Sequence, residues 1–295
     1  MNDQALKLIR KAREELERSK VPFAARSAEE LFMHSFGVKR EDIYGMDVFR
    51  PRMEKIQHFK RRVKLRASRI PIEYILKSAE FMAETFFLDN GVFIPRPETE
   101  LLVEKVLEAI RPAGARRVNI LEIGTGCGNI AISLTKKASR CKIIASDVSD
   151  KALKVAAKNS RAHGTKKRIK FIKSSFFDGL SHIYYNYFDI IVSNPPYVRR
   201  AEIKDLQPEI AFEDKRALDG GEDGLRAYRR ILGEGVKYLK KGGIFAFEIG
   251  YDQSAAVRRL IEKDGRFFGT KFFKDYGGHH RIVTTGYGRG AEKIG

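Results

Sequence analysis

The first 76 residues place their hydrophobic positions at the three- and four-residue spacing of amphipathic helices. One such stripe comprises Leu6, Ile9, Ala12 or Arg13, and Leu16. Ser27 followed by Glu30 has the pattern of a capping box, which predicts that a helix begins at Ser27, and Gly37 is expected to end that helix. These patterns predict a small, all-helical domain at the N-terminus.

The periodicity changes near residue 80 to short apolar stretches. Residues 86–88 and 92–94 flank the pair Asn90 and Gly91. Asn-Gly favours the tight turns that join antiparallel strands, because both residues tolerate positive φ angles. A β-hairpin that turns at Asn90 and Gly91 is therefore predicted between the helical region and the rest of the chain.

Strand-like and helix-like stretches alternate from residue 97 onward. Strands are expected at 118–123, 142–146, 169–173, 189–193 and 243–248, with helices at 130–137, 149–163, 225–239 and 253–263. Two final strands, expected to be antiparallel, are 267–273 and 281–285. Strands rich in Ile and Val that alternate with helices predict an α/β fold with a doubly wound, mostly parallel sheet. The expected segments are a helical domain over 1–78, a hairpin linker over 79–96 and a large α/β domain over 97–295.

The net positive charge of the chain suggests a polyanion as a partner. Lys and Arg number 57 against 38 Asp and Glu, which gives a formal net charge of +19. A field of this sign attracts polyanions, so nucleic acid or the ribosome is a candidate neighbour. The charge is concentrated over residues 50–69, where the spacing of hydrophobic residues predicts a basic amphipathic helix. That helix could contact phosphate or form an ordinary solvated face, and the sequence is compatible with both.

Composition also excludes several classes of protein. Hydrophobic residues make up 43% of the 295 residues, which is enough for a sizeable core. No apolar run approaches the roughly 18 residues that a membrane span requires, and the charged N-terminus lacks the hydrophobic stretch of a secretory signal. Two cysteines, Cys127 and Cys141, are too few for a disulfide framework or a cysteine-rich zinc site. We therefore expect a soluble, cytoplasmic protein with neither a membrane anchor nor a metal.

A glycine-rich segment follows the first expected strand of the large domain. Residues 121–129 read Leu-Glu-Ile-Gly-Thr-Gly-Cys-Gly-Asn, a G-x-G-x-G pattern. Glycines here allow a sharp turn and let a ligand approach the backbone closely. The spacing differs from the G-x-G-x-x-G of dinucleotide sites, and no Gly-Lys-Ser/Thr follows, which excludes a P-loop. Asp147 ends the second strand, where a carboxylate could accept hydrogen bonds from two ribose hydroxyls.

A second motif, Asn194-Pro195-Pro196-Tyr197, follows the fourth strand. The prolines stiffen the loop and remove N–H donors, so the loop presents acceptors at the carboxyl edge of the sheet. The Asn194 side-chain oxygen and the Pro195 carbonyl oxygen can accept both hydrogens of a planar NH2 group that packs against the Tyr197 ring. The lone pair of such a nitrogen is delocalised, so the protein helps most by aiming it at an activated methyl group. This reaction requires no metal.

These features together resemble the Rossmann-like methyltransferases that use S-adenosylmethionine, whose seven-stranded sheet has an antiparallel last strand. The N-P-P-Y motif is similar to that of enzymes that methylate exocyclic base nitrogens or glutamine side chains. Residues 93–100, Phe-Ile-Pro-Arg-Pro-Glu-Thr-Glu, resemble the hallmark of the peptide chain release factor glutamine methyltransferases, and the likeness extends over nearly the whole chain. It implies methylation of N5 of the glutamine in the Gly-Gly-Gln motif of release factors.

The resemblance also implies roles for individual residues. The methionine part of S-adenosylmethionine would be held by Gly124, Thr125, Gly126, Cys127 and Gly128. The ribose would bind Asp147, the adenine would lie against Phe176, and the transferred methyl group would lie next to Asn194. The substrate amide would be held by the catalytic motif Asn194, Pro195, Pro196 and Tyr197, with Arg96 and Glu98 lining the substrate site.

Two positions depart from the family's usual pattern. Lys77 stands near a usual glycine, which could alter the hairpin, and Asp214 replaces a usual proline, which could loosen the loop over the substrate. Cys127 has no sequence partner for nucleophilic chemistry, and His279 and His280 lack the spaced partners of a metal site, so structural roles are expected.

Two other functions remain compatible with the sequence. The first is a DNA or RNA methyltransferase that acts on adenine N6 or cytosine N4, which would flip its base into the N-P-P-Y pocket. The net charge of +19 favours this reading, whereas the lack of a separate recognition domain argues against it. The second is a catalytically idle module that docks on ribosomal particles.

Overall fold

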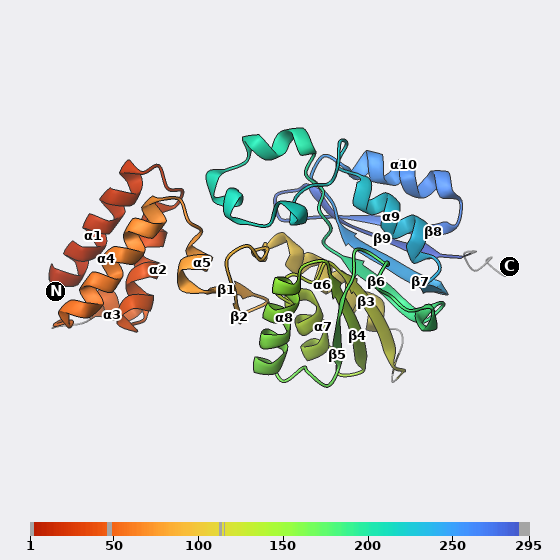
Figure 1. The fold of residues 1–295 in the computed structure, drawn as a ribbon, viewed down its shortest axis with the longest axis horizontal. Helices are drawn as coiled ribbons and strands as arrows, with labels where there is room; N and C mark the ends of the chain where they lie inside the picture. The colour runs from red at the N-terminus through yellow and green to blue at the C-terminus, as the bar shows by residue number, and fades with distance from the viewer. Residues whose placement is uncertain (1–2, 46–48, 112–113, 115, 289–295) are drawn as a thin grey trace. The chain divides into compact units, whose positions relative to one another are not determined.

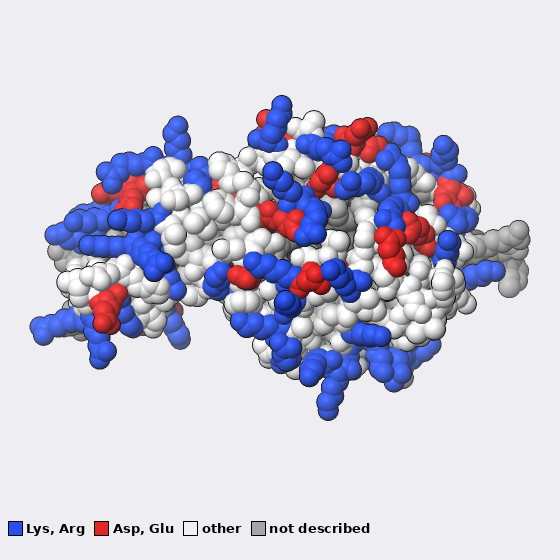
Figure 2. All heavy atoms as spheres, in the orientation of Figure 1, with Lys and Arg blue, Asp and Glu red and all other residues white. Residues whose placement is uncertain are grey.

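The structure, a computed structural model, describes residues 3–45, 49–111, 114 and 116–288. Contacts between residues divide the chain into two compact units. The first comprises the chain up to Ser78 together with Gln207–Phe212, and the second comprises Ala79–Leu206 with the chain from Glu213 onward. Lys and Arg side chains are spread over the surfaces of both units on the face drawn in Figure 2.

The first unit is helical. Its helices are α1 (Asp3–Arg18), α2 (Ala24–Phe36), α3 (Arg40–Gly45), α4 (Met53–Ala67) and α5 (Ile72–Leu76) (Figure 1). Four buried phenylalanines form the centre of its core, with ring centroids 4.5 Å apart for Phe32 and Phe36, 5.0 Å for Phe36 and Phe49, and 5.7 Å for Phe32 and Phe59. Aromatic rings at these separations attract one another in addition to the burial of their surface.

The start of α2 differs from the sequence prediction. The helix begins at Ala24, one turn before Ser27, and the Ser27 N–H already donates to the Phe23 carbonyl oxygen. Ala24 is buried in the core, so packing extends the helix beyond the predicted capping box. The end is as predicted, because Gly37 adopts a φ of 70° and its N–H caps the Met33 carbonyl oxygen.

Helix α4 is the basic helix that the sequence predicts over residues 50–69. Phe59 and Val63 face the core, as the hydrophobic spacing requires. Arg66 is also buried, and it shares the carboxylate of Glu209 with Arg69 at distances of 3.0 Å and 2.6 Å. Two of the basic side chains of this region are therefore paired within the first unit, where they hold the segment Gln207–Phe212 through Glu209.

The second unit is built on a seven-stranded sheet with the order β5-β4-β3-β6-β7-β9-β8. Its strands are β3 (Val118–Ile123), β4 (Cys141–Asp147), β5 (Ile169–Lys173), β6 (Phe188–Ser193), β7 (Leu239–Glu248), β8 (Phe267–Lys274) and β9 (His280–Tyr287). The first five are parallel, whereas the last strand, β9, is antiparallel to both of its neighbours. The predicted α/β fold with an antiparallel last strand is confirmed.

Helices cover both faces of this sheet. One layer holds α6 (Glu98–Ile110), α7 (Asn129–Lys137) and α8 (Asp150–Ala162), and the other holds α9 (Arg226–Gly235) and α10 (Ser254–Asp264) (Figure 1). Helix α6 has no counterpart among the helices expected from the sequence. The helix expected over 225–239 ends at Gly235, and β7 begins at Leu239. Among the described residues, no helix is both long and apolar enough to cross a membrane.

The predicted hairpin turn is wrong in position. The hairpin pairs β1 (Ser78–Phe81) with β2 (Glu84–Phe87) and turns at Met82 and Ala83, whose φ angles are 54° and 61°. Asn90 and Gly91 form a later turn, in which the Val92 N–H donates to the Asp89 carbonyl oxygen. Residues 92–94 form no strand in the structure.

The hydrogen bonds around Asn90 and Gly91 explain this displacement. The Asn159 side chain accepts from the Phe87 N–H and donates to the Phe87 carbonyl oxygen, at 2.8 and 2.9 Å. The Ile94 N–H donates to the carboxylate of Glu213. The backbone groups that a second strand would need are therefore used by side chains.

Lys77 occupies a position that suits glycine. It follows α5 with a φ of 60°, and its N–H caps the helix through the Glu73 carbonyl oxygen. Side chains other than glycine adopt this left-handed conformation at some energetic cost. The positive φ angle explains why glycine suits this position. Lys77 nevertheless keeps the hydrogen bond from its N–H to the Glu73 carbonyl oxygen.

Candidate active site

Three neighbouring strand ends bring the predicted site residues to one edge of the sheet. The last residues of β3 pair in parallel register with those of β4 and β6. Gly124, Asp147 and Asn194 therefore lie at the same carboxyl edge. A Cβ atom on Gly124 would lie only 3.9 Å from the Asn194 carbonyl oxygen. The glycine loop and the N-P-P-Y loop thus lie next to each other at the edge where open α/β sheets bind their ligands.

The glycine loop needs its glycines for two different reasons. Gly124, Gly126 and Gly128 have φ angles of 76°, 56° and 87°, which other residues rarely adopt. A Cβ on Gly126 would meet no atom within 4 Å, so the loop is open on that side. A Cβ on Gly128 would lie 3.1 Å from the Cβ of Ala156 in α8. The first two glycines can admit a ligand, and the third permits close packing.

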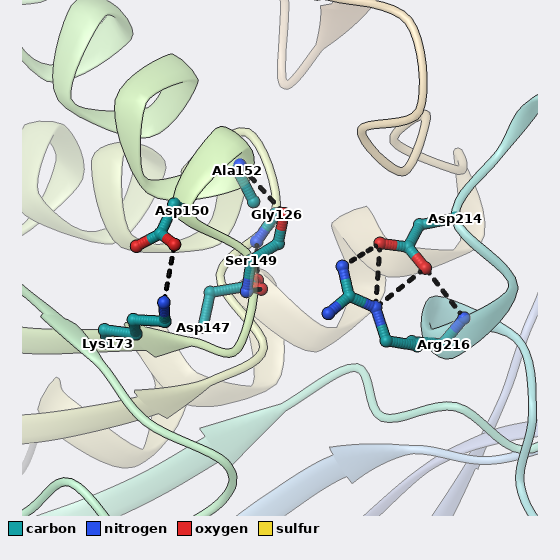
Figure 3. A network of polar contacts seen from close by, with 8 residues as sticks. All are labelled: Gly126, Asp147, Ser149, Asp150, Ala152, Lys173, Asp214 and Arg216. Carbon is teal, nitrogen blue, oxygen red and sulfur yellow. Dashed lines mark hydrogen bonds and ion pairs between the residues drawn. The ribbon is translucent and has the colours of Figure 1, made fainter.

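Asp147 is oriented by two backbone donors. Its Oδ2 accepts from the Gly126 N–H and its Oδ1 from the Ser149 N–H, both at 2.9 Å (Figure 3). Burial raises the pKa of Asp147, and these two donors oppose that shift. Ser149 also caps α8 through the Ala152 N–H, as predicted. Each carboxylate oxygen has a further lone pair with which to accept a hydroxyl of a bound ligand.

The loop at Asp214 lies across from Asp147 in Figure 3. Asp214 accepts from the backbone N–H of Arg216 at 2.9 Å and from its guanidinium at 2.6 Å. The φ of Asp214 is −68°, which a proline would also provide, but a proline could not make these two bonds. Asp214 therefore stabilises this turn by accepting the Arg216 N–H, whereas a proline would stabilise it by restricting the backbone.

Two side chains of this segment are buried, Glu122 at the end of β3 and Cys127 within the glycine loop. Glu122 is fully buried, its Oε2 accepts from the Thr125 hydroxyl at 2.7 Å, and its Oε1 has no partner among the described residues. Burial raises the pKa of Glu122 to about 8. Cys127 is also fully buried, and burial raises the pKa of its thiol to about 12. The thiol is thus protonated and unreactive, which fits a packing role.

Phe176 follows β5, the strand next to β4 in the sheet. The chain enters this region through Ser174, whose N–H donates to the Asp147 carbonyl oxygen at 2.9 Å. Phe176 is half-buried, and the Arg230 guanidinium lies 4.8 Å from its ring centroid. Phe176 thus lies two residues beyond the backbone contact with Asp147, and its ring lies against Arg230 of α9.

The N-P-P-Y loop is connected to a buried carboxylate that sequence reasoning missed. The Asn194 Nδ2 donates to the Thr99 hydroxyl at 3.0 Å, and Thr99 donates to Glu248 Oε2 at 2.7 Å. The Tyr197 hydroxyl donates to Glu248 Oε1 at 3.3 Å. Burial raises the pKa of Glu248 to about 7. The one sequence feature that could have pointed to Glu248 is its position as an acidic residue at the carboxyl end of a buried strand.

Arg96 lies two residues before Glu98, which is the first residue of α6. Arg96 forms an ion pair with Glu213, which is 5% exposed, and its guanidinium lies 4.9 Å from the Phe93 ring. Glu98 is exposed, and its charge contributes to the raised pKa of Glu248. Arg96 is thus ion-paired and its charge acts on Tyr197, whereas Glu98 adds negative charge near the N-P-P-Y network.

The Tyr197 carbonyl oxygen contacts Gln253, the residue before α10, and Gly224 in the loop that precedes α9. Gln253 donates from Nε2 to the Tyr197 carbonyl oxygen at 2.9 Å. Gly224 has a φ of 74°, and a Cβ there would lie 2.5 Å from that same oxygen and would also overlap Gln253. This close approach explains why a residue without a Cβ atom is needed next to the N-P-P-Y motif.

Replacing Gly224 with alanine should therefore shift Tyr197 and destabilise the fold by about 1–3 kcal/mol, as overpacking does. Any reaction that depends on the position of Tyr197 should slow together with the loss of stability. The matched control is Gly233→Ala within α9, where a Cβ would meet nothing within 4 Å. That variant should be neutral or more stable by up to about 1 kcal/mol. Thermal unfolding of both variants tests this expectation, and equal melting temperatures would contradict it.

His279 and His280 fit the structural role expected of them. The His279 ring lies 5.8 Å from the Tyr251 ring, and the His280 ring lies 5.8 Å from the Phe272 ring. Among the described residues there is no group of three or more His, Cys, Asp or Glu side chains that could hold a metal ion.

Comparison with known proteins identifies similar chains. Residues 7–76 match the family model described as PrmC N-terminal domain, and residues 85–222 match the Methyltransferase small domain. The release factor glutamine methyltransferase of Agrobacterium fabrum is 39% identical over 225 residues, which cover 75% of this chain and 76% of that protein. The enzyme of the same name from Chlorobaculum tepidum is 36% identical over 259 residues, with coverages of 85% and 86%.

Solved structures share the fold at low sequence identity. The catalytic domain of hMettl16 in complex with the MAT2A 3′UTR hairpin 6 gives a TM-score of 0.55 at 15% identity, covering 83% of this chain and 85% of that one. The N-terminal domain of human METTL16 in complex with SAH gives 0.51 at 16% identity, covering 80% and 84%. These similarities concern the fold alone.

Proposed function

We propose that this chain, which belongs to the release factor glutamine methyltransferase family, methylates the side-chain amide of a glutamine in a peptide chain release factor. S-adenosylmethionine is the proposed methyl donor, and N5 of the glutamine in the Gly-Gly-Gln motif is the proposed acceptor. The observation that supports the proposal is that the glycine loop and the N-P-P-Y loop are neighbours at one edge of the sheet, with Gly124 close to the Asn194 carbonyl oxygen.

The residues around the glycine loop fit S-adenosylmethionine. The backbone is open at Gly126, and Asp147 keeps acceptor capacity for two ribose hydroxyls. Glu122 adds a buried carboxyl group whose Oε1 has no partner among the described residues. A cationic ligand above the loop would stabilise the ionised form of this group. When bound, S-adenosylmethionine supplies an electrophilic methyl group on a positively charged sulfur.

The N-P-P-Y loop would hold the acceptor. Within the described part of the chain, neither the Asn194 Oδ1 nor the Pro195 carbonyl oxygen has a hydrogen-bond partner. Both can accept from the NH2 group of a glutamine, while the Tyr197 ring packs against the plane of the amide. Fixing both hydrogens aims the nitrogen lone pair at the methyl group and favours the positive charge that develops on nitrogen. The extra proton leaves after transfer, so no strong base is required.

The helical unit is the proposed grip on the folded release factor. Its helix α4 keeps exposed basic residues besides those paired inside the unit. Such a surface can attract an acidic protein face or nearby nucleic acid. The α/β unit would receive the extruded glutamine loop.

The decisive experiment is methylation of a purified release factor with S-adenosylmethionine as donor. Fragmentation mass spectrometry should locate one added methyl group on the glutamine of the Gly-Gly-Gln motif. A release factor in which alanine replaces that glutamine is the matched control and should gain nothing. Methyl transfer to any other residue, or none to the intact motif, would contradict the proposal.

The same assay, run in parallel with DNA and RNA, tests the two other functions. Methylated adenine or cytosine, with binding that weakens steeply as salt increases, would indicate a nucleic-acid methyltransferase. An idle docking module would methylate neither substrate and would give no heat with S-adenosylmethionine in calorimetry.

A further inference from the structure

We propose that Glu248 and Thr99 are positioning residues that set the orientation of the Asn194 side-chain amide and so direct its oxygen toward the substrate. Neither residue belongs to the glycine loop or to the N-P-P-Y motif. The inference rests on the proposed function, because it explains how that site presents an acceptor to the glutamine amide. It follows from the direction of two hydrogen bonds, from Thr99 to Glu248 and from Asn194 to Thr99.

The direction of these bonds begins at the buried carboxylate. An ionised carboxylate only accepts hydrogen bonds. Thr99 must therefore use its single hydrogen to donate to Glu248 Oε2, at 2.7 Å. The Thr99 oxygen can then only accept, and it does so from the Asn194 Nδ2 at 3.0 Å. The NH2 side of Asn194 is thereby held at Thr99, which leaves Oδ1 to accept from the substrate.

The opposite orientation of Asn194 is disfavoured at both ends. Rotating the amide by half a turn would set its oxygen against the Thr99 oxygen, whose hydrogen is already committed to Glu248. The Asn194 NH2 group would then face the NH2 group of the substrate, so that donors would oppose donors. Each mismatch leaves a largely desolvated polar group without a partner, which is unfavourable. The carboxylate thus distinguishes two arrangements that have nearly the same shape.

Glu248 also holds the other end of the motif. Its second oxygen accepts from the Tyr197 hydroxyl at 3.3 Å. Burial, and then the charge of Glu248, raises the pKa of Tyr197, so the hydroxyl remains a donor. One carboxylate therefore fixes both the first and the last residue of Asn194-Pro195-Pro196-Tyr197. This arrangement suits a loop that must hold a planar amide against a ring.

The protonation state of Glu248 should control this arrangement. Burial raises its pKa to about 7, whereas the Thr99 hydrogen bond and the charge of Arg281 lower it and Glu98 raises it. The groups that face it are Thr99 and Glu98 of α6, Tyr197 of the loop, Tyr228 of α9 and Arg281 of β9. Protonated Glu248 carries a hydrogen of its own and no longer compels Thr99 to donate. The rate should therefore fall as pH decreases through about 7 and reach a plateau above it.

Variants of Thr99 test the relay with little change in shape. Thr99→Val removes the hydroxyl and should lower kcat for release factor methylation about tenfold, an effect of lost orientation. Thr99→Ser keeps the hydroxyl and should stay within about twofold of the unchanged chain. The affinity for S-adenosylmethionine, measured by calorimetry, should not change in either variant. Thr135→Val, which removes a buried hydroxyl without a partner on α7, is the matched control and should leave kcat unchanged.

Glu248→Gln supplies a second, independent measurement. Its amide donates as well as accepts, so kcat should fall about tenfold, and the loss of rate below about pH 7 should disappear. Equal kcat for Thr99→Val and Thr99→Ser would overturn the inference. A parallel loss of cofactor affinity and kcat would also overturn it, because that result indicates a purely structural role. Failure of the unaltered chain to methylate any release factor would instead refute the proposed function.

Discussion

Replacing Asn194 with alanine should lower kcat for release factor methylation about a hundredfold, which corresponds to about 2.7 kcal/mol in the barrier. The side-chain oxygen is one of two acceptors available to the substrate amide, and its loss leaves the nitrogen free to rotate. The affinity for S-adenosylmethionine should change less than kcat, because the glycine loop and Asp147 remain. Single-turnover kinetics with saturating cofactor measures the chemical step directly.

Asn119→Ala is a suitable control for this variant. Asn119 lies near the beginning of β3, so it is at the opposite edge of the sheet from the N-P-P-Y loop. Its side-chain oxygen has no partner among the described residues, so its removal breaks no hydrogen bond through that atom. The control should keep kcat within about twofold. An Asn194→Ala variant with unchanged turnover would show that the amide is not held as proposed.

The strands and the turns that follow them could be predicted because their causes are local. Apolar β-branched runs end at Gly124, Asp147 and Asn194, and parallel pairing carries these ends to one edge. The glycine spacing and the two prolines restrict the backbone wherever the rest of the chain lies. The arrangement of the site can therefore be predicted from short segments of the sequence.

Other features depend on partners that are distant in sequence. The hairpin turns at Met82 and Ala83 although Asn90 and Gly91 carry the stronger local turn signal. Asn159, more than 70 residues later, takes the backbone groups that the expected hairpin would have used. The pattern of hydrophobic residues cannot predict this competing hydrogen bond, because it depends on a single distant side chain.

The buried network at Glu248 was missed for the same reason. Thr99 lies at the start of a helix and Glu248 at the end of a strand. Nothing in the sequence around either residue predicts that the two are in contact. Their hydrogen bond spans 149 positions of the chain. Similarly, Glu209 belongs to the first unit, where it forms ion pairs with Arg66 and Arg69 from a distant part of the chain. Sequence patterns indicate which residues can do chemistry, whereas the fold decides which of them meet.

Replacing Asp147 with asparagine should weaken S-adenosylmethionine binding by about tenfold to a hundredfold, in line with about 1.5–3 kcal/mol for hydrogen bonds to a charged group. The carboxylate now accepts the Gly126 and Ser149 N–H groups on separate oxygens and keeps capacity for the ribose. An asparagine has one oxygen, so its NH2 group would oppose one of these N–H groups. Calorimetry measures the dissociation constant, and kcat at saturating cofactor should change little.

Asp150→Asn is the matched control, since it makes the same chemical change three residues away (Figure 3). Asp150 is exposed and pairs with Lys173 at 2.5 Å, and an exposed pair of this kind contributes little. Its removal should leave the dissociation constant within about twofold. Equal affinities for the two variants would place the ribose elsewhere. A loss confined to Asp147→Asn would instead tie cofactor binding to the strand end beside the glycine loop, which is where methyl transfer to Asn194-bound substrate requires it.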